Sequence, residues 1–172
     1  AGAKFNWEKL NWINSQYIKK MELTKLCKFI KNYWKNMGWK SPSKEWDLKL
    51  TNLIQDSMIL LTDAIDQSKP FFSLSIMQIE GGEFLENNSD TIESLKLILH
   101  YLKEENISKV NNDKAREIIN KISKTHSIKK GIVMKSLRVA FFGCLSGPDL
   151  IQSWELFSEN KTDITLIKRC LN

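Results

Sequence analysis

Arg138 is the residue whose type and surroundings offer the most specific chemistry in this chain. It is one of three arginines and stands among Leu137, Val139 and Ala140, near the end of a predicted apolar helix. A guanidinium there can donate a planar pair of hydrogen bonds to the edge of a nucleic-acid base, or stack on the base. The alternative is a structural role, in which the arginine holds the carbonyls of the helix end or a buried carboxylate.

A turn with the sequence Ser-Gly-Pro-Asp-Leu, residues 146–150, follows this helix. Gly147 lets the backbone approach another group closely, because glycine carries no side chain. Pro148 fixes the turn and offers a small apolar surface that can pack against a base. The alternative is an ordinary turn that starts the next helix.

Catalysis finds little support in the sequence. The two histidines, His100 and His126, lie far apart and have no metal-ligand spacing. His100 stands beside the apolar positions of its helix, and His126 lies near a helix C-terminus, where an imidazolium complements the dipole. Gly81-Gly82 lacks the lysine and hydroxyl of a phosphate-binding loop. We therefore predict a chain that is not catalytic by itself and holds no metal or cofactor.

Positive charge is concentrated in two regions. Residues 1–40 carry nine lysines and two acids, and residues 108–140 carry nine basic groups and two acids, so each region has a balance of +7. Residues 41–107 have a balance of −7, and the whole chain has +6. One interpretation is a set of solvated helix faces. The other is two contact surfaces for a polyanion, since clustered cations gain affinity by releasing phosphate counterions.

The elements that would position these residues are helices almost throughout. Apolar spacings of three and four predict an all-α fold, an irregular helical bundle with two small packed subdomains and a boundary near residues 38–43. The capping and stop residues predict helices whose ranges are 7–20 after Asn6, 24–37 before Gly38, 132–142 before Gly143, and 163–170 after Thr162. Ser41-Pro42 is read as a helix start, and residues 73–88 as a loop over the core.

The aromatic residues are expected to pack inside the protein. We predict that Trp12 and Tyr17 pack in the core or between helices. Trp34, Trp39 and Trp46 are expected to form a core or subdomain cluster rather than a stacking platform for bases. With 42% hydrophobic residues, the chain can bury a core of ordinary size.

The chain is expected to be soluble, cytoplasmic and monomeric, with no membrane partner. No apolar run approaches the roughly 20 residues needed to cross a bilayer. The three cysteines are far apart and show neither disulfide nor zinc spacing. The first three residues, Ala-Gly-Ala without an initiator Met, are read as the remnant of an expression tag.

Two sequence blocks resemble a known family. Residues 5–18 contain Lys-Leu-Asn-Trp-Ile-Asn-Ser-Gln-Tyr-Ile, which is similar to a segment that follows the catalytic domain in bacterial-type glutamyl-tRNA synthetases. Residues 129–150 contain Lys-Gly, then Met-Lys-Ser-Leu-Arg-Val-Ala-Phe-Phe-Gly, then Gly-Pro-Asp-Leu, which resembles the anticodon-binding domain of that family. Family members commonly have Pro at the position of Ser136 and Thr at that of Phe142, so this chain departs at both.

The resemblance implies the tRNA-binding, anticodon-reading part of a glutamate–tRNA ligase without its catalytic domain. Residues 4–40 would be stem-contact and linking helices, and residues 41–172 the anticodon-binding domain. The implied partners are tRNA-Glu, tRNA-Gln as a further hypothesis, and the upstream catalytic domain. ATP and Mg²⁺ would belong to that absent domain.

Particular residues take roles from the same resemblance. Arg138 matches a position that contacts an anticodon base, and the loop with Gly147, Pro148 and Leu150 matches one that contacts the first anticodon base. The expected contacts to the tRNA backbone are Lys9, Lys19, Lys20, Lys129, Lys130 and Lys135.

Ser57 is the most informative departure from the family. By helix register it falls near a position where glutamyl enzymes selective for their own tRNA carry an arginine against the third anticodon base. The serine side chain is too short to form the pair of hydrogen bonds with a base that an arginine can form. We therefore hypothesise a non-discriminating enzyme that charges both tRNA-Glu and tRNA-Gln.

Two other functions stay open at this point. One is a free-standing RNA-binding domain derived from the same family. The other is a helical protein-interaction module whose basic regions dock an acidic partner. Steep salt dependence of tRNA binding favours the RNA functions, and indifference to tRNA favours the protein partner.

Overall fold

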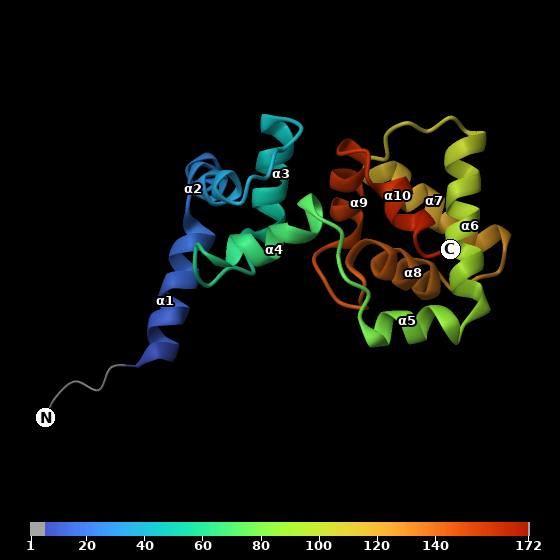
Figure 1. The fold of residues 1–172 in the computed structure, drawn as a ribbon, viewed down its shortest axis with the longest axis horizontal. Helices are drawn as coiled ribbons and strands as arrows, with labels where there is room; N and C mark the ends of the chain where they lie inside the picture. Colours follow the sequence, from blue (N-terminus) through green and yellow to red (C-terminus); the bar gives the residue numbers. More distant parts are fainter. Residues whose placement is uncertain (1–5, 172) are drawn as a thin grey trace, which may run out of the picture. The chain divides into compact units, whose positions relative to one another are not determined.

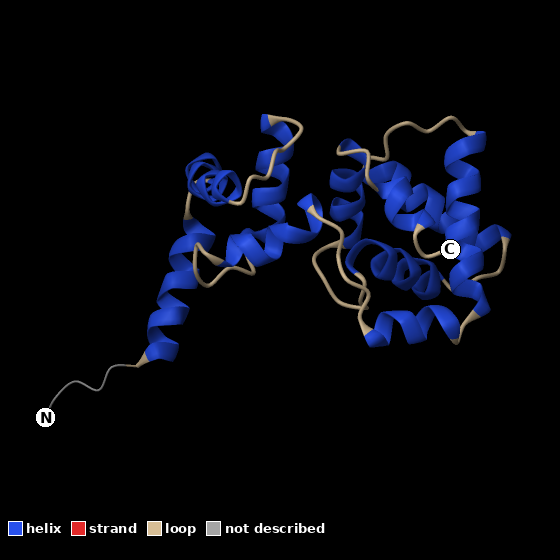
Figure 2. Cartoon of the chain, viewed as in Figure 1, coloured by secondary structure: helices blue, strands red, loops and turns tan. Residues whose placement is uncertain are grey.

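Helices form the entire regular structure of the part of the chain that can be described. The structure is a computed structural model, and it describes residues 6–171. Within this range it contains ten α-helices and no β-strand (Figures 1 and 2). The predicted all-α class is therefore confirmed. The interpretation of the first three residues as a tag remnant lies outside the described range.

The chain divides into two compact units, Ala1–Phe72 and Ser73–Asn172. This division falls after Phe72, whereas the predicted functional boundary lies at residue 40, between α2 and α3, which pack on each other. The functional boundary stays a prediction. The first unit contains α1 (Trp7–Lys20), α2 (Leu23–Asn36), α3 (Lys44–Gln55) and α4 (Asp63–Phe72).

Aromatic packing forms the core of the first unit, as predicted for the tryptophan cluster. The ring of Phe72 lies against three tryptophans, with centroid distances of 5.3 Å to Trp34, 5.2 Å to Trp46 and 4.9 Å to Trp39. Trp34 and Trp46 are buried, and Trp39 is half-buried. Such offset and edge-to-face pairs add to the stabilisation that comes from burial alone.

The first helix is attached at its middle, where Asn14 donates its side-chain amide to the Ile59 carbonyl at 2.9 Å, and at its last turn. Asn6 caps α1, since its side chain accepts a hydrogen bond from the Lys9 amide, as predicted. Gln55 of α3 donates its side-chain amide to the carbonyl of Ile18, at 2.9 Å. The first half of α1 stands clear of α2, α3 and α4 (Figure 1). The prediction that Trp12 and Tyr17 pack inside was wrong, because they are 64% and 70% exposed.

The second unit is built around α8 (Lys130–Phe142), which ends at the left-handed Gly143 as predicted. The helices that pack on it are α5 (Ile79–Glu86), α6 (Ser89–Glu104), α7 (Asn112–Thr125), α9 (Leu150–Glu159) and α10 (Asp163–Lys168) (Figure 1). The rings of Phe141 and Phe157 meet at 4.9 Å in the core between α8 and α9.

Two local predictions are corrected by the structure. Residues 79–86 form α5 and not a loop, although residues 73–78 before them are irregular. The helix expected to start at Ser41-Pro42 begins two residues later, at Lys44, because the side chain of Ser43 accepts from the Trp46 amide and is the actual N-cap.

Candidate nucleic-acid interface

Arg138 and the loop after α8 form one corner of the second unit. Nη1 of Arg138 donates to the carbonyl of Pro148 at 2.8 Å, which joins the helix to the loop. Both residues are half-buried, so neither lies inside the core. A guanidinium has five N–H donors, and this bond uses one of them. The arginine therefore holds a carbonyl, as in its structural alternative, and keeps donors for a ligand.

The loop needs glycine at position 147. Gly147 is exposed and has φ +143°, a conformation that other residues rarely adopt. A Cβ placed there would lie 3.2 Å from Nη1 of Arg138 and 3.1 Å from the Phe142 ring. Leu150, in contrast, is 2% exposed and supports the loop from the core. Its predicted contact with a base is not favoured by this burial.

A segment from the start of the second unit braces this corner. The Gln78 amide donates to the carbonyl of Gly143 at 2.8 Å, and a carboxylate oxygen of Glu80 accepts from the Leu145 amide at 3.2 Å. A Cβ at Gly81 would stand 2.4 Å from the Gly143 carbonyl oxygen, so only glycine permits this approach. The sequence reasoning missed this brace, although Gly81-Gly82 was a signal of close backbone packing.

Arg169, which lies near the C-terminal end of the described range, also holds this segment against α8. It donates from Nη1 to the carbonyl of Ser75 at 2.6 Å and from Nη2 to the carbonyl of Ala140 at 2.9 Å. One side chain thus holds the irregular segment and the last turn of α8 together. Arg169 and Ser75 are 94 positions apart in the sequence, so no local signal pointed to this contact.

Ser57 belongs to the first unit, whereas Arg138 belongs to the second. Ser57 is exposed at the end of α3, and its hydroxyl lies 2.8 Å from the Ile54 carbonyl and 2.6 Å from a side-chain oxygen of Gln67. The Gln67 amide nitrogen also donates to the Ser57 carbonyl at 3.2 Å. A small neutral side chain engaged in this way presents no cation to a base.

The lysines expected to bind a tRNA backbone are all exposed. Lys9, Lys19 and Lys20 lie on α1. Lys129 and Lys130 stand at the N-terminal end of α8, which has no side-chain cap and no acid in its first turn. The helix dipole disfavours cations at this end and favours an anion. Lys135 lies farther along α8, with its ammonium 5.9 Å from the Phe84 ring centroid.

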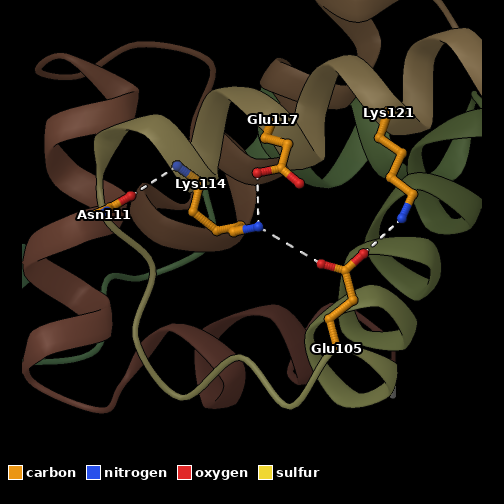
Figure 3. Close-up of polar contacts among 5 residues, drawn as sticks. All are labelled: Glu105, Asn111, Lys114, Glu117 and Lys121. Carbon is orange, nitrogen blue, oxygen red and sulfur yellow. Dashed lines mark hydrogen bonds and ion pairs between the residues drawn. The ribbon is translucent and has the colours of Figure 1, made fainter.

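The second positive region is partly neutralised by acids. Figure 3 shows Lys114 and Lys121 of α7 reaching Glu105, with Nζ to carboxylate distances of 3.8 Å and 2.6 Å, while Lys114 also lies 2.7 Å from Glu117. Lys109 pairs with Glu159 at 3.0 Å. The local balance of +7 therefore overstates the cationic surface that residues 108–140 can offer.

These ion pairs hold their members in charged form. The hydrogen bond from Lys121 lowers the pKa of Glu105 and raises that of Lys121. The hydrogen bond to Glu117 raises the pKa of Lys114. Each shift favours the ionised state of its group, so the lysines and acids of this cluster are charged at neutral pH.

Other kinds of site find no support in the described range. Residues 6–171 contain no group of three or more His, Cys, Asp or Glu arranged to hold a metal ion. None of the helices in the same range combines the length and apolar character that crossing a membrane requires. Cys27 and Cys144 are buried free thiols, and Cys170 is a half-buried one.

Comparison with known proteins identifies relatives over nearly the whole chain. The glutamate–tRNA ligase of Prochlorococcus marinus subsp. pastoris (strain MED4) is 81% identical over all 172 residues, the first three included. The enzyme of strain NATL2A is 43% identical over 171 residues. The alignments cover 36% of each relative, so this chain spans about a third of their length.

A solved structure and a family model agree with these relatives. A glutamate–tRNA ligase structure from Elizabethkingia meningosepticum superposes with a TM-score of 0.88 at 22% identity, covering 99% of this chain and 33% of that one, so it supports the fold. Residues 12–164 match the model of the family described as "Anticodon binding domain". The chain therefore belongs to the anticodon-binding domain family and corresponds to that region of glutamate–tRNA ligases.

Proposed function

We propose that this chain binds tRNA-Glu and inspects its anticodon, as part of a ligase that attaches glutamate to the tRNA using ATP. The observation that carries this proposal is the corner formed by Arg138, Gly147 and Pro148. The half-buried guanidinium of Arg138 lies beside Gly147, which has no side chain. It can therefore reach the edge of an unpaired base. Single-stranded loop bases are read in this way, because an A-form helix hides its major groove.

Backbone contacts would complete the binding. Phosphate contacts set the register of a nucleic acid, while base contacts carry sequence identity. Lys129 and Lys130 are well placed to bind a phosphate. The helix dipole repels these two lysines at the uncapped start of α8, and a bound anion would offset that repulsion. Lys130 precedes Arg138 by eight residues, which places it roughly 12 Å from that arginine along the helix axis. Lys9, Lys19 and Lys20 would add contacts from α1.

The test is a titration of the chain with an anticodon stem-loop of tRNA-Glu. Arg138→Ala should weaken binding by ~1–3 kcal/mol, since it removes a base contact. Arg116→Ala is the matched control, because Arg116 is an exposed arginine on α7. Circular dichroism establishes that both variants keep their helices. Equal affinity of the two variants, or no saturable binding of the stem-loop, would overturn the proposal.

We further infer that the parent enzyme charges tRNA-Gln as well as tRNA-Glu. This inference is supported by Ser57, an exposed neutral side chain near the position where selective enzymes of the family carry an arginine. Charging of the two tRNAs by the full-length ligase tests it. Comparable charging is expected, with Ser57→Arg reducing the rate for tRNA-Gln more than for tRNA-Glu. Strong rejection of tRNA-Gln by the unmodified enzyme would end the inference.

A further inference from the structure

A concavity opens in the first unit where α2 ends. The chain reverses at Gly38, which has φ +73°, and the space between the last turns of α2 and residues 38–41 measures about 420 Å³. Sites for small ligands typically occupy about 300–1000 Å³. The concavity is thus large enough for a small organic ligand.

One wall of the concavity is aromatic. The Trp39 ring stacks on Phe72, with centroids 4.9 Å apart and an interplanar angle of 13°. Phe72 covers one face of the ring, and Trp39, which is half-buried, is one of the residues that line the concavity. Its backbone is fixed too, because the Trp39 amide donates to the carbonyl of Trp34 at 2.9 Å. A rigid indole of this kind offers a stacking surface for any base.

The rim is cationic. Lys31 and Lys35 lie one turn apart on α2 and therefore on the same face, and Lys40 follows the reversal. The Lys31 ammonium is already bound to the buried carboxylate of Asp47 at 2.6 Å. Lys35 and Lys40 are exposed and have no carboxylate partner among residues 6–171. They are thus the cations that remain for a ligand, and they must also outweigh the negative end of the α2 dipole.

We propose that this concavity binds a nucleoside 5′-phosphate, with the base against Trp39 and the phosphate held by Lys35 and Lys40. An aromatic wall beside two ammonium groups matches a ligand that joins a flat ring to a phosphate. Asn32 and Ser41 also line the space and supply hydrogen-bonding groups for the base edge or the sugar. A metal cation would be repelled by these ammonium groups, and a purely apolar ligand would gain nothing from them.

The proposal is independent of the anticodon contact, because the concavity belongs to the first unit and Arg138 to the second. The ligand chemistry has two sources, an unpaired nucleotide within an RNA strand or a free mononucleotide. A 5′-phosphorylated tetranucleotide and the matching monophosphate separate them. Tighter binding of the strand assigns the site to RNA, and equal binding assigns it to free nucleotides. Binding of neither overturns the proposal.

The main experiment is an NMR titration of the ¹⁵N-labelled chain with the four nucleoside 5′-monophosphates, with nucleosides and inorganic phosphate as separate probes. Saturable shifts of the Trp39 indole and of residues 35–41 are expected, with at least tenfold weaker binding of nucleosides and of phosphate. Inorganic phosphate that binds as tightly as the monophosphates would contradict the aromatic contact. Shifts spread over the second unit instead would contradict the location.

Paired variants test the rim and the wall. The double variant Lys35→Gln, Lys40→Gln should weaken binding of the monophosphates at least tenfold. Its control, Lys25→Gln with Lys28→Gln, makes the same charge change at exposed positions of α2 and should stay within twofold.

Trp39→Leu should abolish the shifts. If that variant fails to fold, Trp39→Phe should retain the fold and weaken binding. Equal losses of monophosphate binding in the double lysine variant and its control would overturn the site. Arg138→Ala should leave monophosphate binding to the concavity unchanged.

Discussion

The two units differ in how they carry positive charge. The first has twelve lysines and seven acids, a balance of +5, and the second has fourteen basic residues and thirteen acids, a balance of +1. Lys19 and Lys20 stand exposed on α1, whereas Lys114 and Lys121 are paired with Glu105 (Figure 3). The first unit therefore carries most of the net positive charge of the chain.

The units also differ in how tightly their turns are packed. Gly38 in the first unit and Gly143 in the second both have φ +73°, and both end a helix. A Cβ at Gly38 would meet no atom within 4 Å, whereas a Cβ at Gly143 would lie 2.3 Å from the backbone carbonyl oxygen of Ile76. The same backbone conformation thus serves an open turn in one unit and a crowded crossing of chain segments in the other.

The largest expected effect is a loss of stability when alanine replaces the glycine of each turn. Gly143→Ala should lower the free energy of unfolding by about 2–4 kcal/mol, because it adds a backbone clash to the left-handed strain. Gly38→Ala should lower it by only about 1–2 kcal/mol, from strain alone. Urea unfolding of the two variants measures both values. Equal losses would show that the crossing at Gly143 is not crowded.

The salt dependence of tRNA binding tests whether the lysines of the first unit carry more unpaired charge than those of α7. Lys19→Gln with Lys20→Gln should reduce the slope of log K against log salt concentration for tRNA binding by about 1 for each phosphate that these lysines bind. Lys114→Gln with Lys121→Gln removes the same charge and should change the slope less, because Glu105 already neutralises these lysines. Fluorescence anisotropy at several salt concentrations provides the slopes. A larger change for the second pair would reverse the comparison.

The smallest expected effect concerns the two buried aspartates. Asp47 in the first unit is paired with Lys31, whereas Asp163 in the second accepts a hydrogen bond from the neutral Trp154 indole at 3.2 Å. Burial raises the pKa of Asp163 above its usual value of 3.8. Its stabilising contribution is therefore present below that value and is lost as the pH rises through the raised pKa.

Asp163→Asn should remove this dependence. Relative to the variant, the unmodified chain should lose stability as the pH rises from 3 through the raised pKa and then level off. Urea unfolding across this range, at constant ionic strength, measures the difference between the two chains. A difference that stays constant with pH would show that Asp163 titrates in the folded chain as it does when unfolded.

Local signals in the sequence were enough to predict helices such as α1 and α8. Asn6 caps α1 and Gly143 ends α8 because both features depend on residues within one turn. The helix α5 was missed because Gly81-Gly82 is unfavourable in a helix, and its reason for being there is tertiary. Gly81 allows the backbone to lie against the Gly143 carbonyl, 62 residues away in the sequence.

The candidate site was predictable only in part. Arg138 and the loop after α8 are ten residues apart, and a motif could therefore identify both. The contacts of Arg169 and the pairing of Lys121 with Glu105 arise from the fold, and composition gave no sign of them. Trp12 and Tyr17 were expected inside because aromatic residues usually pack, yet both side chains stand exposed on α1.

The most direct test of the central claim is a double-mutant cycle between Arg138 and the anticodon. Binding of the chain and of its Arg138→Ala variant is measured to stem-loops that differ by single anticodon bases. At one base, the two changes should be coupled by about 1–3 kcal/mol, because they remove the same contact. At the other bases the effects should add within about 0.5 kcal/mol. Additive losses at every anticodon position would contradict base reading by Arg138.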